Sequence, residues 1–178
     1  MKFIRLDKNN QVNGAGLRCV VWVSGCENYC DGCHNPESWD YDLGHIWDVQ
    51  DQTTLDQQLS SPEISGITLT GGDPMAPKNR DAAATFCAMV KNKYPEKTIW
   101  MYTGYLFEDL VGHGWLENVD VLIDGRYKKE LNPGPGKAKW RGSTNQRVID
   151  VKESLKQHCI VEYRDFNGKT ITENERGN

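Results

Sequence analysis

Three cysteines close together on one segment constrain this chain more than any other feature. Cys26, Cys30 and Cys33 form a C-x3-C-x2-C run directly after the apolar segment 19–23. Three thiolates at this spacing can hold one compact inorganic centre, but a structural zinc site or a cubane cluster ligated only by cysteine needs a fourth ligand. The fold must therefore deliver this loop from a strand and leave one coordination position to another group.

Size and charge exclude several classes of protein. A chain of 178 residues predicts one domain, with residues 1–158 as its core and residues 159–178 as a hairpin or tail of the same domain. The formal net charge is −4 and no block of Lys and Arg resembles a nucleic-acid footprint. We therefore expect no nucleic-acid partner.

The apolar segments also exclude a membrane protein. The longest apolar run is far too short to span a bilayer, and Met1–Phe3 leads into charged residues instead of a signal-peptide apolar region. We expect a cytoplasmic protein, in which thiols stay reduced. Six cysteines in that compartment favour metal or redox chemistry over a disulfide framework.

The order of apolar segments predicts alternating strands and helices. The helix at 77–94 has the clearest periodicity. Thr53 or Thr54 is expected to cap the preceding helix, at 53–59. Alternation of this kind predicts an α/β fold with parallel β/α units. Asn167-Gly168 predicts a hairpin in the tail, which we expect to be peripheral. Strands are expected at 2–6, 19–23, 66–70, 99–102, 119–123 and 147–151, and helices at 53–59, 77–94 and 106–112.

The three cysteines suit a [4Fe–4S] cluster with one iron left without a protein ligand. Such an iron can chelate a small molecule through an amine and a carboxylate, and S-adenosylmethionine carries both groups. An electron passed from the cluster to its sulfonium cleaves S-adenosylmethionine to methionine and a 5′-deoxyadenosyl radical, chemistry that the cofactors supply. The protein then has to place the groups and exclude water.

A zinc site made by the same cysteines and His34 is the alternative. Adjacent Cys33 and His34 have difficulty reaching one ion, and Cys19, Cys87 and Cys159 supply no second C-x2-C pair. Those three isolated cysteines are interpreted as small buried or half-buried apolar residues.

Gly71-Gly72-Asp73-Pro74 follows a predicted strand and supports the cofactor interpretation. Two glycines let the backbone approach a ligand closely, and their carbonyl groups, with Asp73, can accept hydrogen bonds from a charged amino group. An ordinary strand-to-helix turn has the same composition. Combined with the three cysteines, the motif resembles the GGE-type motif of the radical S-adenosylmethionine superfamily, with Asp73 where many members have Glu.

The resemblance to that superfamily implies further contacts. Many members have an aromatic residue immediately before the third cysteine, near the adenine, whereas this chain has Gly32. The adenine contact would then fall to the backbone of Gly32 and to Cys33 and His34. A solvent-facing loop position is the other interpretation of His34.

Six motifs in the same order resemble one family, the activating proteins of anaerobic ribonucleoside-triphosphate reductases. The resemblance implies an oxidoreductase that takes a hydrogen from one glycine of the reductase, so that the reductase carries a glycyl radical. It also implies a flavodoxin-type electron donor. We predict a partial, open β/α barrel of about five or six mainly parallel strands, with an open side for the partner. The motifs are 13–18, 33–39, 71–74, 100–105, 121–125 and 140–147.

Other activities and residue roles stay open at this point. A pyruvate formate-lyase activase shares a similar Cys-His-Asn segment, and a small-molecule radical enzyme has a similar core. Thr103 and Asp124 end predicted strands, so they either contact the cofactor or cap and turn the chain. Arg141 and Gln146 lie in a glycine-rich loop that could contact the reductase or the cofactor, and a structural salt bridge explains Arg141 equally well.

Overall fold

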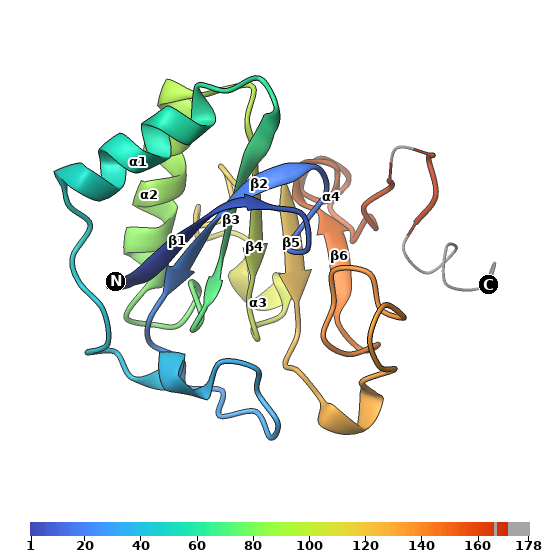
Figure 1. Ribbon diagram of the computed structural model, residues 1–178. Helices are drawn as coiled ribbons and strands as arrows, with labels where there is room; N and C mark the ends of the chain where they lie inside the picture. Colours follow the sequence, from blue (N-terminus) through green and yellow to red (C-terminus); the bar gives the residue numbers. More distant parts are fainter. Residues whose placement is uncertain (166, 171–178) are drawn as a thin grey trace.

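Six strands form one mixed sheet, and their order in space is the same as their order along the chain (Figure 1). The computed structural model describes residues 1–165 and 167–170. The three central ladders, from β2 to β5, are parallel, while β1 and β6 run antiparallel to their neighbours. The strands are β1 (Phe3–Asn10), β2 (Leu17–Val23), β3 (Ile64–Gly71), β4 (Thr98–Tyr102), β5 (Val121–Asp124) and β6 (Arg147–Asp150).

The α/β prediction is confirmed, with a six-stranded sheet that is mostly parallel in its middle. Within the described residues no ladder joins β1 to β6, so these strands form the two edges of the sheet. The sheet is therefore open, and barrel geometry is not established by the strand pairing.

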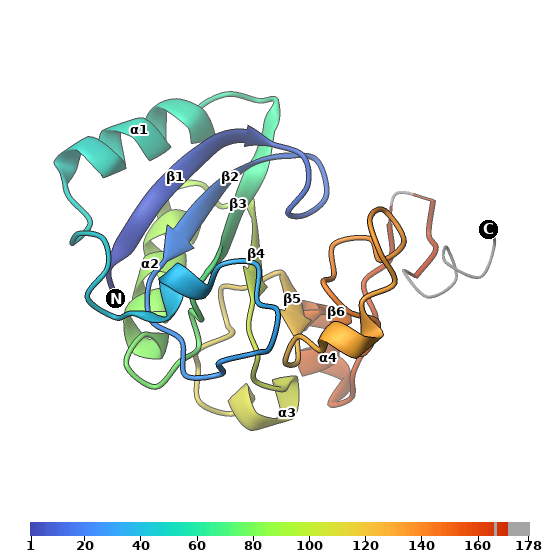
Figure 2. The ribbon, with the colours of Figure 1, turned by 60° about the horizontal axis from the view of Figure 1, so that its bottom comes forward.

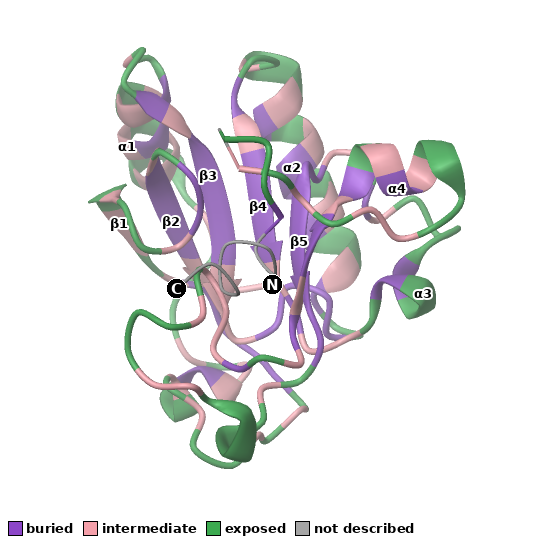
Figure 3. Ribbon diagram, turned by 90° about the vertical axis from the view of Figure 1, so that its right-hand side faces the viewer, coloured by how far each residue is buried: buried purple, intermediate pink, exposed green. Residues whose placement is uncertain are grey.

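The two faces of the sheet carry different side chains because successive residues of a strand alternate in direction. Cys19, Val21 and Val23 of β2 belong to the larger core, together with residues of α1 (Val49–Leu59) and α2 (Arg80–Lys93). These two helices therefore cover one face, and strands β2 to β5 are largely buried, as the purple ribbons of Figure 3 show.

A smaller apolar cluster covers part of the opposite face. Trp100, Ile123 and Val148 form it, with Trp140 and Tyr163 packed against it. The rings of Trp100 and Tyr163 meet edge to face at 5.1 Å. The segment after β6 thus packs onto the sheet, which the sequence interpretation of a peripheral ribbon did not anticipate.

Helix α1 begins four residues before the expected position. Asp48 is its N-cap and accepts hydrogen bonds from the backbone of Gln50 and Asp51, in a capping box. The predicted caps were wrong, because the hydroxyls of Thr53 and Thr54 lie inside the helix and donate to carbonyl groups four residues earlier.

Four further short elements precede the tail. Helix α3 spans Phe107–Leu110, and 3-10 turns span η1 (Pro36–Trp39) and η2 (Lys129–Leu131). Helix α4 (Val151–Gln157) was not predicted, because it starts directly at the end of β6, where Asp150 caps it.

The tail is described in part. Glu162 bridges to Ile149 of β6, and Arg164 bridges to Thr170 across Asn167-Gly168. The expected hairpin extends to Thr172, and its last two residues lie outside the described part of the chain. Cys159 is exposed, contrary to the buried or half-buried position expected for it. No helix in the described part of the chain has the length and apolar character needed to cross a membrane.

Candidate active site

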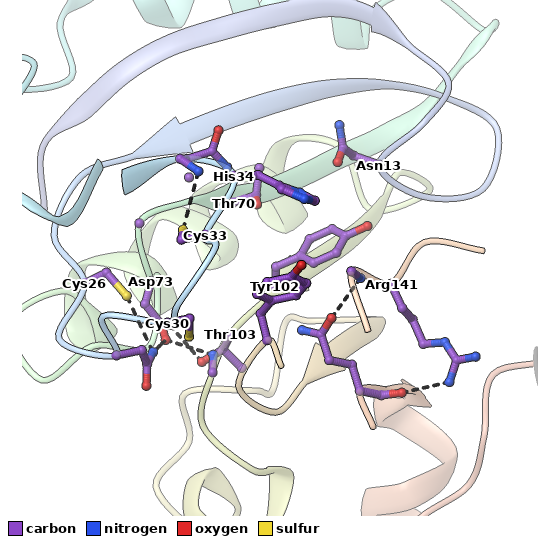
Figure 4. A pocket seen from close by; sticks show the side chains of 18 of the residues that line it. Asn13, Cys26, Cys30, Cys33, His34, Thr70, Asp73, Tyr102, Thr103 and Arg141 are labelled. Atoms are coloured by element: carbon purple, nitrogen blue, oxygen red, sulfur yellow. Dashed lines mark hydrogen bonds between the residues drawn. The ribbon is translucent and has the colours of Figure 1, made fainter. Parts of the chain in front are cut away.

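The cysteine loop lies at the carboxyl ends of the parallel strands. Cys26, Cys30 and Cys33 line one cavity of about 430 Å³, which also contains Gly71 and Gly72 at the end of β3. Figure 4 shows the three sulfur atoms and the Asp73 side chain around this cavity. A cavity of this size, lined by both apolar and polar side chains, lies within the range of small-molecule sites.

Backbone hydrogen bonds fix the cysteine loop from both sides. The amide of Cys26 donates to the carbonyl of Trp39 at 3.1 Å, and the amide of Asp73 donates to the carbonyl of Gly25 at 2.8 Å. The buried side chain of Asn79 donates to the carbonyl of Ser24 at 2.8 Å. The loop is therefore tied to three segments that follow it in the sequence, which limits its freedom to move.

The two glycines allow the β3 turn to approach the cysteine loop. A Cβ on Gly72 would lie 2.6 Å from the carbonyl oxygen of Gly25, and one on Gly71 would lie 2.6 Å from that of Val23. Gly71 also has a φ of 103°, a conformation that disfavours other residues. The sequence interpretation assigned the close approach to a ligand. At these Cβ positions the neighbours are instead the end of β2, at Gly71, and the loop that carries the cysteines, at Gly72.

Asp73 has a fully occupied carboxylate. Its Oδ1 accepts from the hydroxyl of Thr103 at 2.7 Å and the amide of Met75 at 2.9 Å. Its Oδ2 accepts from the side chain of Asn28 at 2.8 Å and the amide of Gly104 at 2.9 Å. Burial raises the pKa of Asp73, and these four donors act against that rise. The Asp73 side chain therefore joins three loops, and the hydroxyl of Thr103 makes one of the hydrogen bonds that join them.

Asn28 is a functional candidate that sequence reasoning missed. Its amide nitrogen donates to Asp73 and lies 3.5 Å from the sulfur of Cys26, with a geometry that makes a second hydrogen bond. The only signal in the sequence is its place inside the cysteine run. Hydrogen bonds to cysteine sulfur are one of the means by which proteins tune iron–sulfur clusters.

The donor set fits an iron–sulfur cluster better than a single zinc ion. Tetrahedral zinc with Zn–S bonds of about 2.3 Å needs sulfur atoms about 3.8 Å apart. The three sulfur atoms do not all lie within 4.8 Å of one another, since the one group of this kind found in the described residues is His45, Asp48 and Asp51. A cluster takes each cysteine on a different iron, which suits the wider spacing.

Comparisons with known proteins place the chain in a family. The family described as a 4Fe-4S single cluster domain matches residues 12–149. The anaerobic ribonucleoside-triphosphate reductase-activating protein of Enterobacteria phage T4 is 41% identical over 89% of this chain and 99% of its own length. The proteins of that name from Haemophilus influenzae and Escherichia coli K12 are 36% and 34% identical, over 85% and 79% of this chain and 99% and 93% of their own lengths.

The chain belongs to the family of anaerobic ribonucleoside-triphosphate reductase-activating proteins. This confirms the resemblance predicted from its motifs. The match to a 4Fe-4S domain supports an iron–sulfur cluster in this member of the family, and the matched range contains all three cysteines of the cavity.

The other predicted contacts divide into two groups. His34, Arg141 and Gln146 line the cavity of this family member. Gln146 is held by the amide of Gly142 at 2.8 Å, and Arg141 donates to the carbonyl of Gln146 at 2.9 Å. Their contacts with a cofactor remain predictions.

Gly32 and Asp124 do not line the cavity. Gly32 has a φ of 70°, and its missing side chain makes room for Lys129. Asp124 is buried, accepts from the amide of Phe107 at 2.8 Å and pairs with Arg147, so it performs the capping role that the sequence left open.

Aromatic and polar side chains on the inner face of the sheet were missed as site residues. Trp22, Thr70 and Tyr102 line the cavity from β2, β3 and β4, and Asn13 closes it from the turn after β1. Figure 4 shows Tyr102, Thr70 and His34 among the residues around the cavity. Burial raises the pKa of Tyr102, which keeps its hydroxyl protonated. Their strand pattern predicts only a buried sheet, so no signal in it marks them as cavity residues.

Proposed function

We propose that this chain activates an anaerobic ribonucleoside-triphosphate reductase by generating a glycyl radical on it. Cys26, Cys30 and Cys33 would hold one [4Fe–4S] cluster, and S-adenosylmethionine would bind in the adjacent cavity. When bound, these groups supply reductive cleavage of S-adenosylmethionine to methionine and a 5′-deoxyadenosyl radical, which removes the hydrogen from the glycine.

One observation carries this proposal. In a member of this family, three cysteines whose sulfur atoms do not all lie within 4.8 Å of one another border a cavity of about 430 Å³ at the carboxyl ends of parallel strands. Active sites of parallel α/β folds gather at that edge. The three thiols leave a fourth position for a ligand other than cysteine.

The residues of the chain position the reacting groups. The hydrogen bonds of Gly25 and Asp73 hold the cysteine loop against β3, and we propose that the carbonyl groups of Gly71 and Gly72 accept from the amino group of S-adenosylmethionine. His34 and the backbone around Cys33 are the proposed adenine contacts. Tyr102, on the wall of the cavity, limits the entry of water.

The open sheet suits a macromolecular substrate. We propose that it acts as a partial barrel, with an open side through which a glycine-bearing segment of the reductase reaches the cavity. Residues 1–158 would be the core domain, with residues 159–178 in the same domain, since Tyr163 packs on Trp100. A cytoplasmic setting with a flavodoxin-type electron donor completes the proposal.

Anaerobic reconstitution tests this function. The protein would be loaded with iron and sulfide, reduced with dithionite, and mixed with S-adenosylmethionine and purified anaerobic reductase. We expect 5′-deoxyadenosine and the electron paramagnetic resonance signal of a glycyl radical on the reductase. A pyruvate formate-lyase is the matched control substrate. A radical on the lyase alone would contradict the reductase assignment, and stoichiometric zinc without sulfide would exclude the cluster.

Replacing the three cysteines one at a time identifies the cluster ligands. Alanine at Cys26, Cys30 or Cys33 should abolish cleavage of S-adenosylmethionine and lower the iron bound per chain. Cys159→Ala is the matched control, because Cys159 is exposed and does not line the cavity. Retained cleavage in any of the three variants would remove that cysteine from the proposed ligand set.

A further inference from the structure

The segment from Arg126 to Arg141, named here the basic loop, has a charge opposite to that of the rest of the protein. It contains six cationic residues and one acidic residue, Glu130, which gives a net charge of +5 in a chain whose net charge is −4. Arg126, Lys128, Lys129, Lys137 and Lys139 are exposed, and Arg141 is half-buried.

The basic loop forms one wall of the cavity. It joins β5 to the approach to β6, and its residues Tyr127, Ala138, Trp140 and Arg141 line the cavity. Figure 2 shows it, in orange, next to the cysteine loop, in blue. The guanidinium of Arg126 donates to the carbonyl of Asn28, which joins the two loops directly. A segment that enters the cavity from solvent therefore passes beside the basic loop.

The charges of the basic loop are weakly compensated within the protein. Lys129 lies 3.6 Å from Asp31, with both side chains mostly exposed, and Lys139 lies 4.0 Å from Asp165. In the described part of the chain, Lys128 and Lys137 have no carboxylate within 4.0 Å of their amino groups. The Lys129–Asp31 pair is exposed and contributes little, whereas Lys139 pairs with a carboxylate that is only 6% exposed. The positive potential that faces solvent therefore comes mainly from Lys128, Lys129 and Lys137.

Two exposed apolar side chains lie on segments that border the cavity. Val12 is 74% exposed and lines the cavity, and Tyr29 is 64% exposed between two of the cysteines. Tyr29 has a φ of 45°, a costly conformation for a bulky residue, and its ring packs edge to face on Trp39 at 5.3 Å. Apolar residues next to a charged rim are typical of protein–protein interfaces.

We propose that the basic loop is the docking surface for an acidic segment of the reductase, adjoining the glycine that enters the cavity. This inference rests on the proposed function and names the chemistry of its partner. Lys128 and Lys137 steer the partner by charge, while Val12 and Tyr29 supply the apolar contact. An electron donor does not need to enter the cavity, so the wall position of the loop favours the reductase as its occupant.

Charge reversal tests the docking surface. The variant Lys128→Glu/Lys137→Glu changes two exposed residues that do not line the cavity. The variant Lys8→Glu/Lys156→Glu changes exposed lysines on β1 and α4, with the same change in net charge. Binding of each reconstituted protein to purified reductase would be measured anaerobically by biolayer interferometry at low and high salt.

We expect the association rate constant of Lys128→Glu/Lys137→Glu to fall about tenfold at low salt, with a smaller fall at high salt. The control variant should bind like the parent protein. Lys128→Gln/Lys137→Gln removes the charge without reversing it, and it should show an intermediate loss. Iron content and the thermal midpoint of each variant establish that it is folded and loaded.

Three results would overturn the docking inference. The first is equal binding to the reductase by the two charge-reversal variants. The second is that Lys128→Glu/Lys137→Glu loses binding to flavodoxin but keeps binding to the reductase. The third is that the parent protein binds nucleic acid more strongly than it binds the reductase. If the parent protein generates the glycyl radical in any of these cases, the proposed function stands without the docking surface. If it generates none, the proposed function itself fails.

Discussion

The side-chain amide nitrogen of Asn28 lies 2.8 Å from the carboxylate of Asp73 and 3.5 Å from the sulfur of Cys26. One side chain thus connects the cysteine loop to the turn after β3. Because Asp73 also binds Thr103 and Gly104, the position of one proposed cluster ligand depends on the ends of three elements.

Replacing Asn28 by alanine removes both hydrogen bonds. We expect the reduction potential of the reconstituted cluster to fall, because a hydrogen bond to sulfur stabilises the more negative, reduced state. Stability should fall by about 2 kcal/mol, since Asp73 loses one donor. A redox titration followed by electron paramagnetic resonance measures the potential. An unchanged potential with lower stability would leave Asn28 with a structural role only.

Gly72→Ala should displace the cysteine loop. Its Cβ would lie 2.6 Å from the carbonyl oxygen of Gly25, which is backbone and cannot rotate away. We expect a loss of about 1–3 kcal/mol in the free energy of unfolding, with lower iron content after reconstitution. Gly112→Ala is the control, because a Cβ at Gly112 would meet no atom within 4 Å, so its φ of 87° strains the backbone there without crowding the cysteine loop. Equal iron content in the two variants would contradict the proposed packing role.

Asp124→Asn should weaken the fold without changing the affinity for S-adenosylmethionine. Asp124 is buried and pairs with Arg147 outside the cavity, with one contact at 2.9 Å. Loss of this charged partner should cost about 2 kcal/mol. Glu108→Gln is the control, because Glu108 is 54% exposed and its pair with Arg147 contributes less. Calorimetry measures the affinity, and a clear loss in Asp124→Asn would restore Asp124 as a cofactor contact.

Stability should fall at alkaline pH because of a buried thiol. Burial raises the pKa of Cys87 from 9.0 to about 12. The unfolded chain therefore loses this proton first, and the folded state becomes less favoured as the pH rises above 9, by about 1.4 kcal/mol for each pH unit. Denaturant unfolding at pH 8 to 10 should show a shallower decline for Cys87→Ala. Parallel declines for the parent protein and the variant would contradict the shifted pKa.

The cysteine run, the glycine motif and the alternation of strands and helices were readable from the sequence alone. Each depends on neighbouring residues, because metal-ligand spacing, tight turns and apolar periodicity are local properties. The same patterns led to the family, since its motifs occur in order along the chain. They did not identify the cap of α1, because Asp48 lies in a polar stretch without apolar periodicity.

Only the tertiary structure decided what these residues contact. Asp73 and Asp124 both follow strands, yet one binds four donors beside the cysteines and the other turns to Arg147, outside the cavity. Tyr102 became a cavity wall because the alternation of β4 points it to the inner face, which sequence cannot assign as a site. Residues far apart in the chain meet only when the sheet assembles, so the sequence determined the chemistry of the groups and the fold determined their partners.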